Sequence, residues 1–215
     1  MKSTIRFIAF FSLLVVVASC SCDRYDEAKN ALNAVKNLAE NADDIQESMD
    51  EANKRMEDRK KRGDTLAIHY EKLAEYLPES FAGYKKDGDI DGGTTTSPGL
   101  GSFSNVSQRY LNASGDEVEI DIVDYNTAFA MYSTIMAAYA SGIEIDNTEE
   151  QIKGFEYSDE IKGWTVLRKK DHVAEAYIGV NDRFHISVQA DNQESTDFVI
   201  DVITKNMSVD RLAAY

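Results

Sequence analysis

The amino-acid sequence predicts an α+β protein: a long N-terminal amphipathic helix, then a two-layer domain with an antiparallel sheet and two helices. Two observations carry this prediction. Over residues 23–77, which contain no proline and a single glycine, apolar residues recur every three or four positions, as in an amphipathic helix. Beyond residue 78, segments of alternating apolar and polar residues are separated by short turns. That pattern is typical of antiparallel strands with one buried face.

Residues 1–19 have the organisation of an export signal. Lys2 and Arg6 precede an apolar run of roughly eleven residues, FIAFFSLLVVV, which is too short to span a membrane but suits a signal peptide. The run leads into Val17-Ala18-Ser19-Cys20, which resembles the lipobox of bacterial lipoproteins. The resemblance implies cleavage before Cys20 and attachment of a diacylglycerol to its sulfur. The alternative is an ordinary cleaved signal with an incidental cysteine.

The resemblance also implies a location in the bacterial cell envelope. Ser21 stands where an aspartate would direct inner-membrane retention in enteric bacteria, so the expected destination is the outer membrane. Acidic residues at 23, 26 and 27 resemble the surface-export tag of some Bacteroidota lipoproteins, and the sequence leaves open which side of the membrane the protein faces. Both cysteines, Cys20 and Cys22, lie at this junction, so the exported domain has no internal disulfide.

The chain is strongly acidic, with a formal net charge of −15, and loss of the leader would remove two positive charges more. This charge argues against nucleic acid as a partner, because the phosphates would be repelled. It also argues against a domain lying flat on an anionic membrane. Cation binding, a basic partner and simple solubility remain open.

Residues 20–77 are expected to form a lipid-anchored helical stalk, ended by Pro78. The apolar stripe keeps its register through Gly63, which favours one continuous helix. The alternative is a helical hairpin broken at Gly63-Asp64, because glycine is preferred just past a helix end and aspartate is a good N-cap. The stripe could pair with a second helix or pack along the C-terminal domain.

Residues 78–215 are expected to form the sheet domain. Its predicted order is strands, a helix, a four-strand meander and a final helix, with residues 87–101 as a loop rich in glycine, threonine and aspartate. Strands are predicted at 81–85, 102–112, 117–124, 153–157, 161–169, 173–180 and 183–190, and helices at 126–139 and 194–206. This element order resembles the PsbP-like fold, whose members act mainly as binding or assembly modules.

The sharpest candidate site is Asp87, Asp89 and Asp91, followed by Gly92. Aspartates at alternate positions before a glycine look like the start of a calcium loop, although Pro98 stands where the closing bidentate glutamate is needed. The alternative is a solvated loop. A phosphate-binding loop is disfavoured because residues 87–101 contain no lysine.

Other candidate groups have weaker patterns. His69, His172 and His185 are scattered, so a zinc site is not expected. His185 is predicted on a polar sheet face with Arg183 and Ser187, where a catalytic grouping would be possible but an exposed strand face is the simpler interpretation. Trp164 could stack on a ligand or pack in the core. The acidic strand with Glu117, Glu119 and Asp121 could meet a basic partner or solvent.

The function expected from these observations is that of a non-catalytic, membrane-anchored envelope lipoprotein whose sheet domain binds a protein or glycan. The alternative is a lipoprotein that binds calcium or a small ligand through residues 87–101, and less readily a hydrolase.

Overall fold

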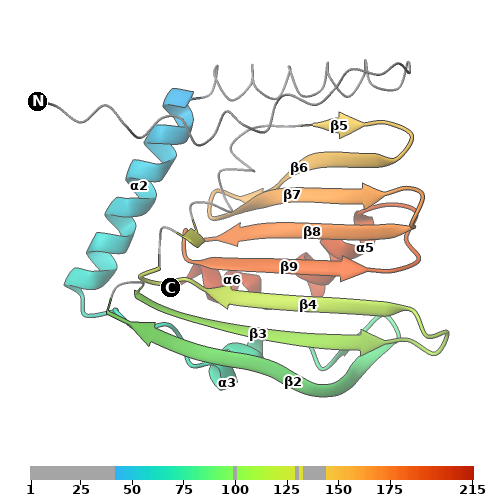
Figure 1. The fold of residues 1–215 in the computed structure, drawn as a ribbon, viewed down its shortest axis with the longest axis horizontal. Coiled ribbons are helices and arrows are strands. Elements are labelled where there is room, and N and C mark those ends of the chain that lie inside the picture. The colour runs from blue at the N-terminus through green and yellow to red at the C-terminus, as the bar shows by residue number, and fades with distance from the viewer. Residues whose placement is uncertain (1–41, 99–100, 129–130, 133–143) are drawn as a thin grey trace, which may run out of the picture.

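The computed structural model describes residues 42–98, 101–128, 131–132 and 144–215, and its central element is a nine-stranded antiparallel sheet (Figure 1). The strand order is β1-β2-β3-β4-β9-β8-β7-β6-β5. Two meanders, β1–β4 and β5–β9, therefore meet side by side where β4 pairs with β9. The strands are β1 (Ser80–Phe81), β2 (Tyr84–Ser97), β3 (Gly101–Leu111), β4 (Glu117–Asp124), β5 (Ile145–Asp146), β6 (Glu150–Ser158), β7 (Ile161–Arg168), β8 (Val173–Val180) and β9 (Phe184–Ala190).

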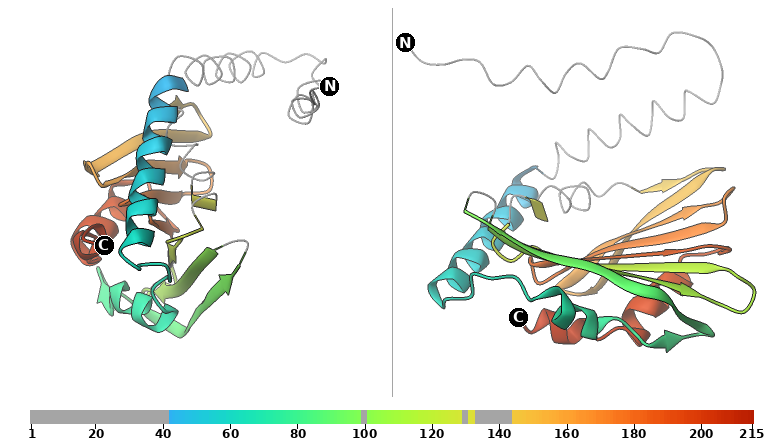
Figure 2. Two further views of the ribbon diagram at one scale, coloured as in Figure 1. Left: turned by 90° about the vertical axis from the view of Figure 1, so that its left-hand side faces the viewer. Right: turned by 60° about the horizontal axis from the view of Figure 1, so that its bottom comes forward.

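Short helices pack against one face of this sheet and form the second layer (Figure 2). They are α3 (Tyr70–Leu73), the 3₁₀ turn η1 (Ala74–Tyr76), α5 (Asp197–Asp201), the π-helical turn η2 (Val202–Asn206) and α6 (Val209–Ala213). The core lies between these helices and the sheet, where Leu73, Val199 and Leu212 are fully buried. The two-layer α+β prediction is confirmed for this part of the chain.

Most predicted strands are present, because their alternating pattern matches the buried and exposed faces of the sheet. Val118, Ile120 and Ile122 of β4 are fully buried on the predicted core side. The predicted final helix corresponds to α5 and η2, and α6 adds a further turn. The segment predicted as one strand at 81–85 is instead the turn between β1 and β2, with Ala82 and Gly83 at positive φ. The predicted helix at 126–139 lies largely outside the described residues.

The prediction of one continuous helix to Leu77 is wrong. Helix α2 (Ala42–Lys61) ends before Gly63, whose φ is +83°. The Gly63 amide donates to the Lys60 carbonyl and the Asp64 amide to the Arg59 carbonyl, each at 3.0 Å, which is a Schellman cap. The break is where the hairpin alternative placed it, but residues 64–69 continue without regular secondary structure and lead only to the single turn of α3. The stretch before Ala42 lies outside the described residues.

The prediction of a loop at 87–101 is also wrong, because most of this segment belongs to the long strand β2. It pairs with β3 from Lys85–Leu111 to Ser97–Gly101, with a bulge between Asp87 and Asp91. Glycine here permits close packing: a Cβ added to Gly92 would lie 2.8 Å from the Asn105 carbonyl oxygen. Pairing with β3 supplies backbone hydrogen bonds that outweigh the low strand propensity of glycine and aspartate.

Helix α2 crosses the end of the sheet where β4 ends and β9 begins (Figure 1). Arg55 of α2 pairs with Asp182 in the β8–β9 turn, and Arg59 Nη2 lies 3.4 Å from the Asp182 carbonyl oxygen. Among the described helices, none is long and apolar enough to cross a membrane.

Candidate functional site

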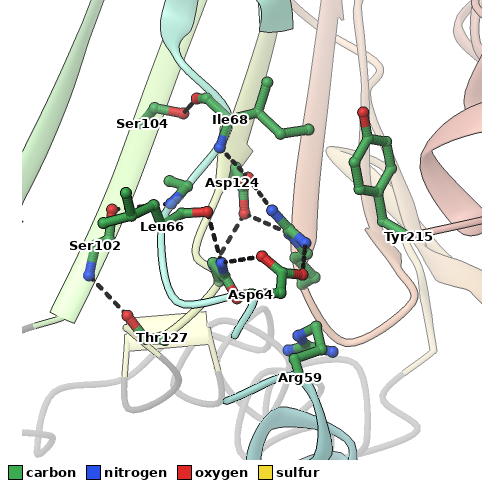
Figure 3. Close-up of polar contacts among 12 residues, drawn as sticks. Arg59, Asp64, Leu66, Ile68, Ser102, Ser104, Asp124, Thr127 and Tyr215 are labelled. Atoms are coloured by element: carbon green, nitrogen blue, oxygen red, sulfur yellow. Dashed lines mark hydrogen bonds and ion pairs between the residues drawn. The ribbon is translucent and has the colours of Figure 1, made fainter. Parts of the chain in front are cut away.

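A buried ion cluster that includes Asp64 and Asp124 lies where α2, β4 and β9 meet (Figure 3), and Arg183 binds both of these carboxylates. Arg183 donates from Nε to Asp124 Oδ1 and from Nη2 to Asp124 Oδ2, both at 2.8 Å. Its Nη1 donates to Asp64 Oδ2 at 2.7 Å. The side chains of Arg183 and Asp124 are 1% and 0% exposed, so this two-point pair is shielded from water.

The same cluster fixes the connection between α2 and α3. Asp124 accepts the amides of Ile68 and Asn126, at 2.8 and 2.9 Å. The Asn126 side chain donates to the Leu66 carbonyl at 2.7 Å and to Asp64 Oδ1 at 3.0 Å. These contacts satisfy backbone groups that have no strand or helix partner in this segment, as buried backbone requires.

Two serines of β3 also bind the segment that connects α2 to α3. Ser102 Oγ accepts the Ala67 amide at 2.9 Å, and Ser104 Oγ donates to the Ile68 carbonyl (Figure 3). The Ser102 amide in turn donates to Thr127 Oγ1 at 2.8 Å. Side chains thus make the hydrogen bonds to the backbone of this segment that a neighbouring strand would otherwise make.

The ion cluster sets one guanidinium, that of Arg183, against two carboxylates, those of Asp124 and Asp64. Burial by itself lowers the pKa of Arg183, but the hydrogen bonds and charges of Asp124 and Asp64 outweigh it, so the net shift of this pKa is upward. The guanidinium also lies about 5 Å from the Phe184 and Tyr215 ring centroids, at 5.0 and 5.1 Å. Because Arg183 engages both carboxylates, the cluster joins segments of the chain, and within the described residues neither of its carboxylates is left unpaired.

Arg59 lies beside this cluster, and its side chain is 2% exposed. Its Nε has no hydrogen-bond partner among the described residues, and burial together with the charge of Arg183 lowers the pKa of Arg59. Asp64, Asp124 and Asp182 partly offset that shift. The Arg59 guanidinium thus lies buried between α2 and the end of the sheet that carries Arg183 and Asp182.

An aromatic row crosses three strands on the opposite face of the sheet. We use this name for Trp164 of β7, Tyr177 of β8 and His185 of β9. The Trp164 and Tyr177 ring centroids are 5.1 Å apart and those of Tyr177 and His185 are 6.2 Å apart, with an interplanar angle of 22° in each pair. Ile178 and Ile186, the next residues along β8 and β9, point into the core, so the row faces away from α3, α5 and α6.

Polar neighbours hold the row in place. The Tyr177 hydroxyl donates to Glu175 Oε2 at 3.2 Å, and Glu175, whose side chain is 4% exposed, also pairs with Arg168. Burial, followed by the charge of Glu175, raises the pKa of Tyr177 to about 12. Ser187 of β9 is the register partner of Tyr177, and its Oγ donates to Asp121 Oδ2 at 3.0 Å. The hydrogen bond to Glu175 and the stacking on Trp164 thus orient the Tyr177 ring.

His185 is 8% exposed, and its Nε2 has no hydrogen-bond partner in the part of the chain that the structure describes. Burial lowers the pKa of His185 to about 4, and Asp121 offsets this only in part, so the ring is neutral at pH 7. Ser187 donates to Asp121 and not to His185, so these residues lack the serine–histidine hydrogen bond of a nucleophile and its base. The prediction that Arg183 shares an exposed polar face with His185 is wrong, because Arg183 belongs to the buried ion cluster.

The predicted calcium residues lie on β2 and its bulge. Asp87 pairs with Arg109 of β3, and Asp91 lies opposite Ser107 after the bulge that contains Asp89. Across the described ranges, no group of three or more histidine, cysteine, aspartate or glutamate residues is placed to hold a metal ion. Calcium binding at these residues stays a prediction, as does lipid attachment at Cys20, which lies outside the described ranges.

One feature of the sequence points to the ion cluster. The buried side of β4 runs Val118, Ile120, Ile122 and then Asp124, so the apolar series continues into a carboxylate at a core-facing position. A charge in that position needs a buried partner. The identity of that partner, Arg183, depends on the β4–β9 pairing and could not be read from the local pattern.

No protein-family model matches the chain, and neither the curated proteins nor the solved structures give a significant match.

Proposed function

We propose that this chain is a membrane-anchored envelope lipoprotein whose sheet domain binds a protein or glycan without catalysing a reaction. The observation that supports this proposal is the aromatic row of Trp164, Tyr177 and His185, aligned on the sheet face away from α3, α5 and α6. Rings fixed on a rigid sheet offer a large contact area at little cost in conformational entropy.

The chemistry of the row favours binding over catalysis. His185 is neutral and buried, the Ser187 hydroxyl donates to a carboxylate, and Glu175 is engaged by Arg168 and Tyr177. Trp164, by contrast, is only partly buried, so its ring offers contact area to a partner. A surface of this kind recognises shape and apolar area.

The anchor is proposed from the lipobox at residues 17–20 and the absence of any cysteine after Cys22. In bacteria that attach lipid at Cys20, labelled fatty acid should be incorporated into the wild-type chain and lost from Cys20→Ser. Cys22→Ser is the matched control and should keep the label. Equal labelling of both variants would contradict attachment at Cys20.

The binding face is tested by affinity capture from solubilised envelope membranes with the acylated protein. Trp164→Ala should lose the captured partner, whereas Leu66→Ala, which trims a side chain that is 62% exposed on another part of the surface, should retain it. Circular dichroism must show that both variants are folded. Unchanged capture by folded Trp164→Ala would contradict binding through the aromatic row.

A further inference from the structure

The aromatic row has an open end at β6. Gly154 of β6 is the register partner of Trp164, just as Tyr177 is its partner on β8. Directly paired residues lie on the same face of a sheet, and neighbouring strands are about 4.8 Å apart. Gly154 is exposed, and among the described residues no atom would lie within 4 Å of a Cβ added there. One side of the indole therefore stacks on Tyr177, and the other faces open space above Gly154.

We call this space the Gly154 slot, and register pairs on the same face border it. On one side lies the pair Glu156 and Lys162, which is polar. On the other lies Ile152 with Val166, which is apolar. Glu156 is exposed and Lys162 half-buried, whereas Val166 is 9% exposed. The slot thus combines a flat aromatic wall, an apolar side and a polar side with one charge of each sign.

We propose that the Gly154 slot binds one sugar ring of a neutral glycan. This inference rests on the proposed function and names the ligand class of the same face. A pyranose ring has apolar C–H faces and hydroxyl groups around its rim. One C–H face would stack on Trp164, while rim hydroxyls donate to Glu156 and accept from Lys162.

The two charged side chains beside the slot favour some flat ligands over others. Glu156 and Lys162 cancel each other, which suits an uncharged ligand that both donates and accepts hydrogen bonds. An aromatic side chain of a protein partner would fill the slot but would offer no hydrogen bonds to Glu156 and Lys162. A nucleotide would bring phosphate to a chain whose formal net charge is −15.

The slot is preformed, because contacts on the far side of Trp164 hold β7 rigidly against β8. A Cβ added to Gly163 would lie 1.9 Å from the Tyr177 carbonyl oxygen, so the two backbones approach closely beside Trp164. Glu175 holds the Tyr177 hydroxyl at 3.2 Å. A rigid wall reduces the entropy lost when a ligand stacks on it.

Trp164 is the single tryptophan of the chain, so its fluorescence reports directly on the slot. The purified acylated protein, in a detergent without sugar groups, is titrated with neutral cello-, malto-, xylo- and chito-oligosaccharides. We expect a saturable change in tryptophan emission with at least one series. Gly154→Val, which places a branched side chain in the slot, should weaken that binding at least tenfold.

The matched control is Gly93→Val on the same face of β2, where an added Cβ meets only the Asn105 side chain at 4.0 Å. It should bind sugar like the wild type. No emission change with any of the four series would overturn the inference, and so would equal binding by Gly154→Val and wild type. If Trp164→Ala loses its captured partner but Gly154→Val keeps it, the face binds a partner outside the slot. In that case the sugar inference fails and the proposed function stands.

Discussion

Arg183 and Asp124 form a two-point ion pair, with both N–O distances 2.8 Å, in which neither side chain is more than 1% exposed. The pair joins the end of β4 to the start of β9 at the centre of the sheet. Its burial means that removal of one partner leaves a charge that solvent cannot stabilise.

Asp124→Asn should therefore lower the free energy of unfolding by about 3–5 kcal/mol, because Arg183 loses its main counter-charge. Urea unfolding followed by circular dichroism measures this loss. Asp201→Asn, which removes the exposed pair with Lys205, is the matched control and should cost less than about 1 kcal/mol. Similar losses of unfolding free energy in the two variants would show that the buried pair stabilises the fold no more than the exposed pair does.

Gly63→Ala should destabilise the protein by about 1–2 kcal/mol, because a side chain is unfavourable at a φ of +83°. Gly63→Asn should cost less, since asparagine tolerates the left-handed region. Thermal melting of the two variants compares these effects. If alanine and asparagine are equally tolerated, the Schellman cap does not fix the end of α2.

Gly163→Ala should destabilise the sheet by at least about 1–3 kcal/mol, because its Cβ would lie 1.9 Å from the Tyr177 carbonyl oxygen and the backbone must move. The emission of Trp164 should shift with it. Gly154→Ala, with no atom within 4 Å of its Cβ, is the control on the neighbouring strand. Equal stability of the two variants would contradict the close approach of β7 and β8.

The pKa of His185 should make stability depend on pH. It is about 4 in the folded protein and about 6.5 in the unfolded chain, so between these values the unfolded state binds more protons. This contribution to stability is thus fully present above about pH 6.5 and is lost as the pH is lowered toward 4, by about 3 kcal/mol in all.

His185→Gln should remove this part of the pH dependence. Urea unfolding at pH 7 and pH 5, above the main titration of the carboxylates, isolates the effect. His172→Gln, which changes an exposed turn residue, should behave like the wild type. A loss of stability between pH 7 and pH 5 that is the same in His185→Gln and wild type would assign it to other groups.

Millimolar calcium should leave the melting temperature unchanged, because the Asp87 carboxylate is already paired with Arg109. An ion that binds only the folded state would raise that temperature. Arg109→Ala frees the carboxylate and tests whether the arginine is what prevents binding. A rise in the wild-type melting temperature would establish an ion site.

The strands were predictable wherever one face is buried, as in β4 and β9, because burial imposes an alternation that sequence shows directly. The strand β2 was not, since its glycines, aspartates and threonines resemble a loop and become a strand only through pairing with β3. The apolar stripe continues past Gly63, so the sequence pattern does not show that a cap at Gly63 ends α2. Both errors arise where tertiary contacts or a cap outweigh local pattern.

The site was predictable only in part. Trp164 was identified as a candidate stacking residue, but its alignment with Tyr177 and His185 follows from the register of three strands. The open space at Gly154 depends on a fourth strand, β6. Strand register over such separations is a property of the whole sheet, and no local pattern contains it.

The ion cluster also determines where mechanical load would enter the fold. Asp64 follows α2 directly, and it is bound to Arg183 at the junction of β4 and β9, which has three strands on one side and four on the other. Tension on the N-terminal end of the chain is therefore delivered to the middle of the sheet. An edge strand can be peeled away one hydrogen bond at a time, whereas a central attachment spreads force over both meanders. With the anchor proposed at Cys20, tension would reach this domain at the centre of its sheet and not at an edge strand.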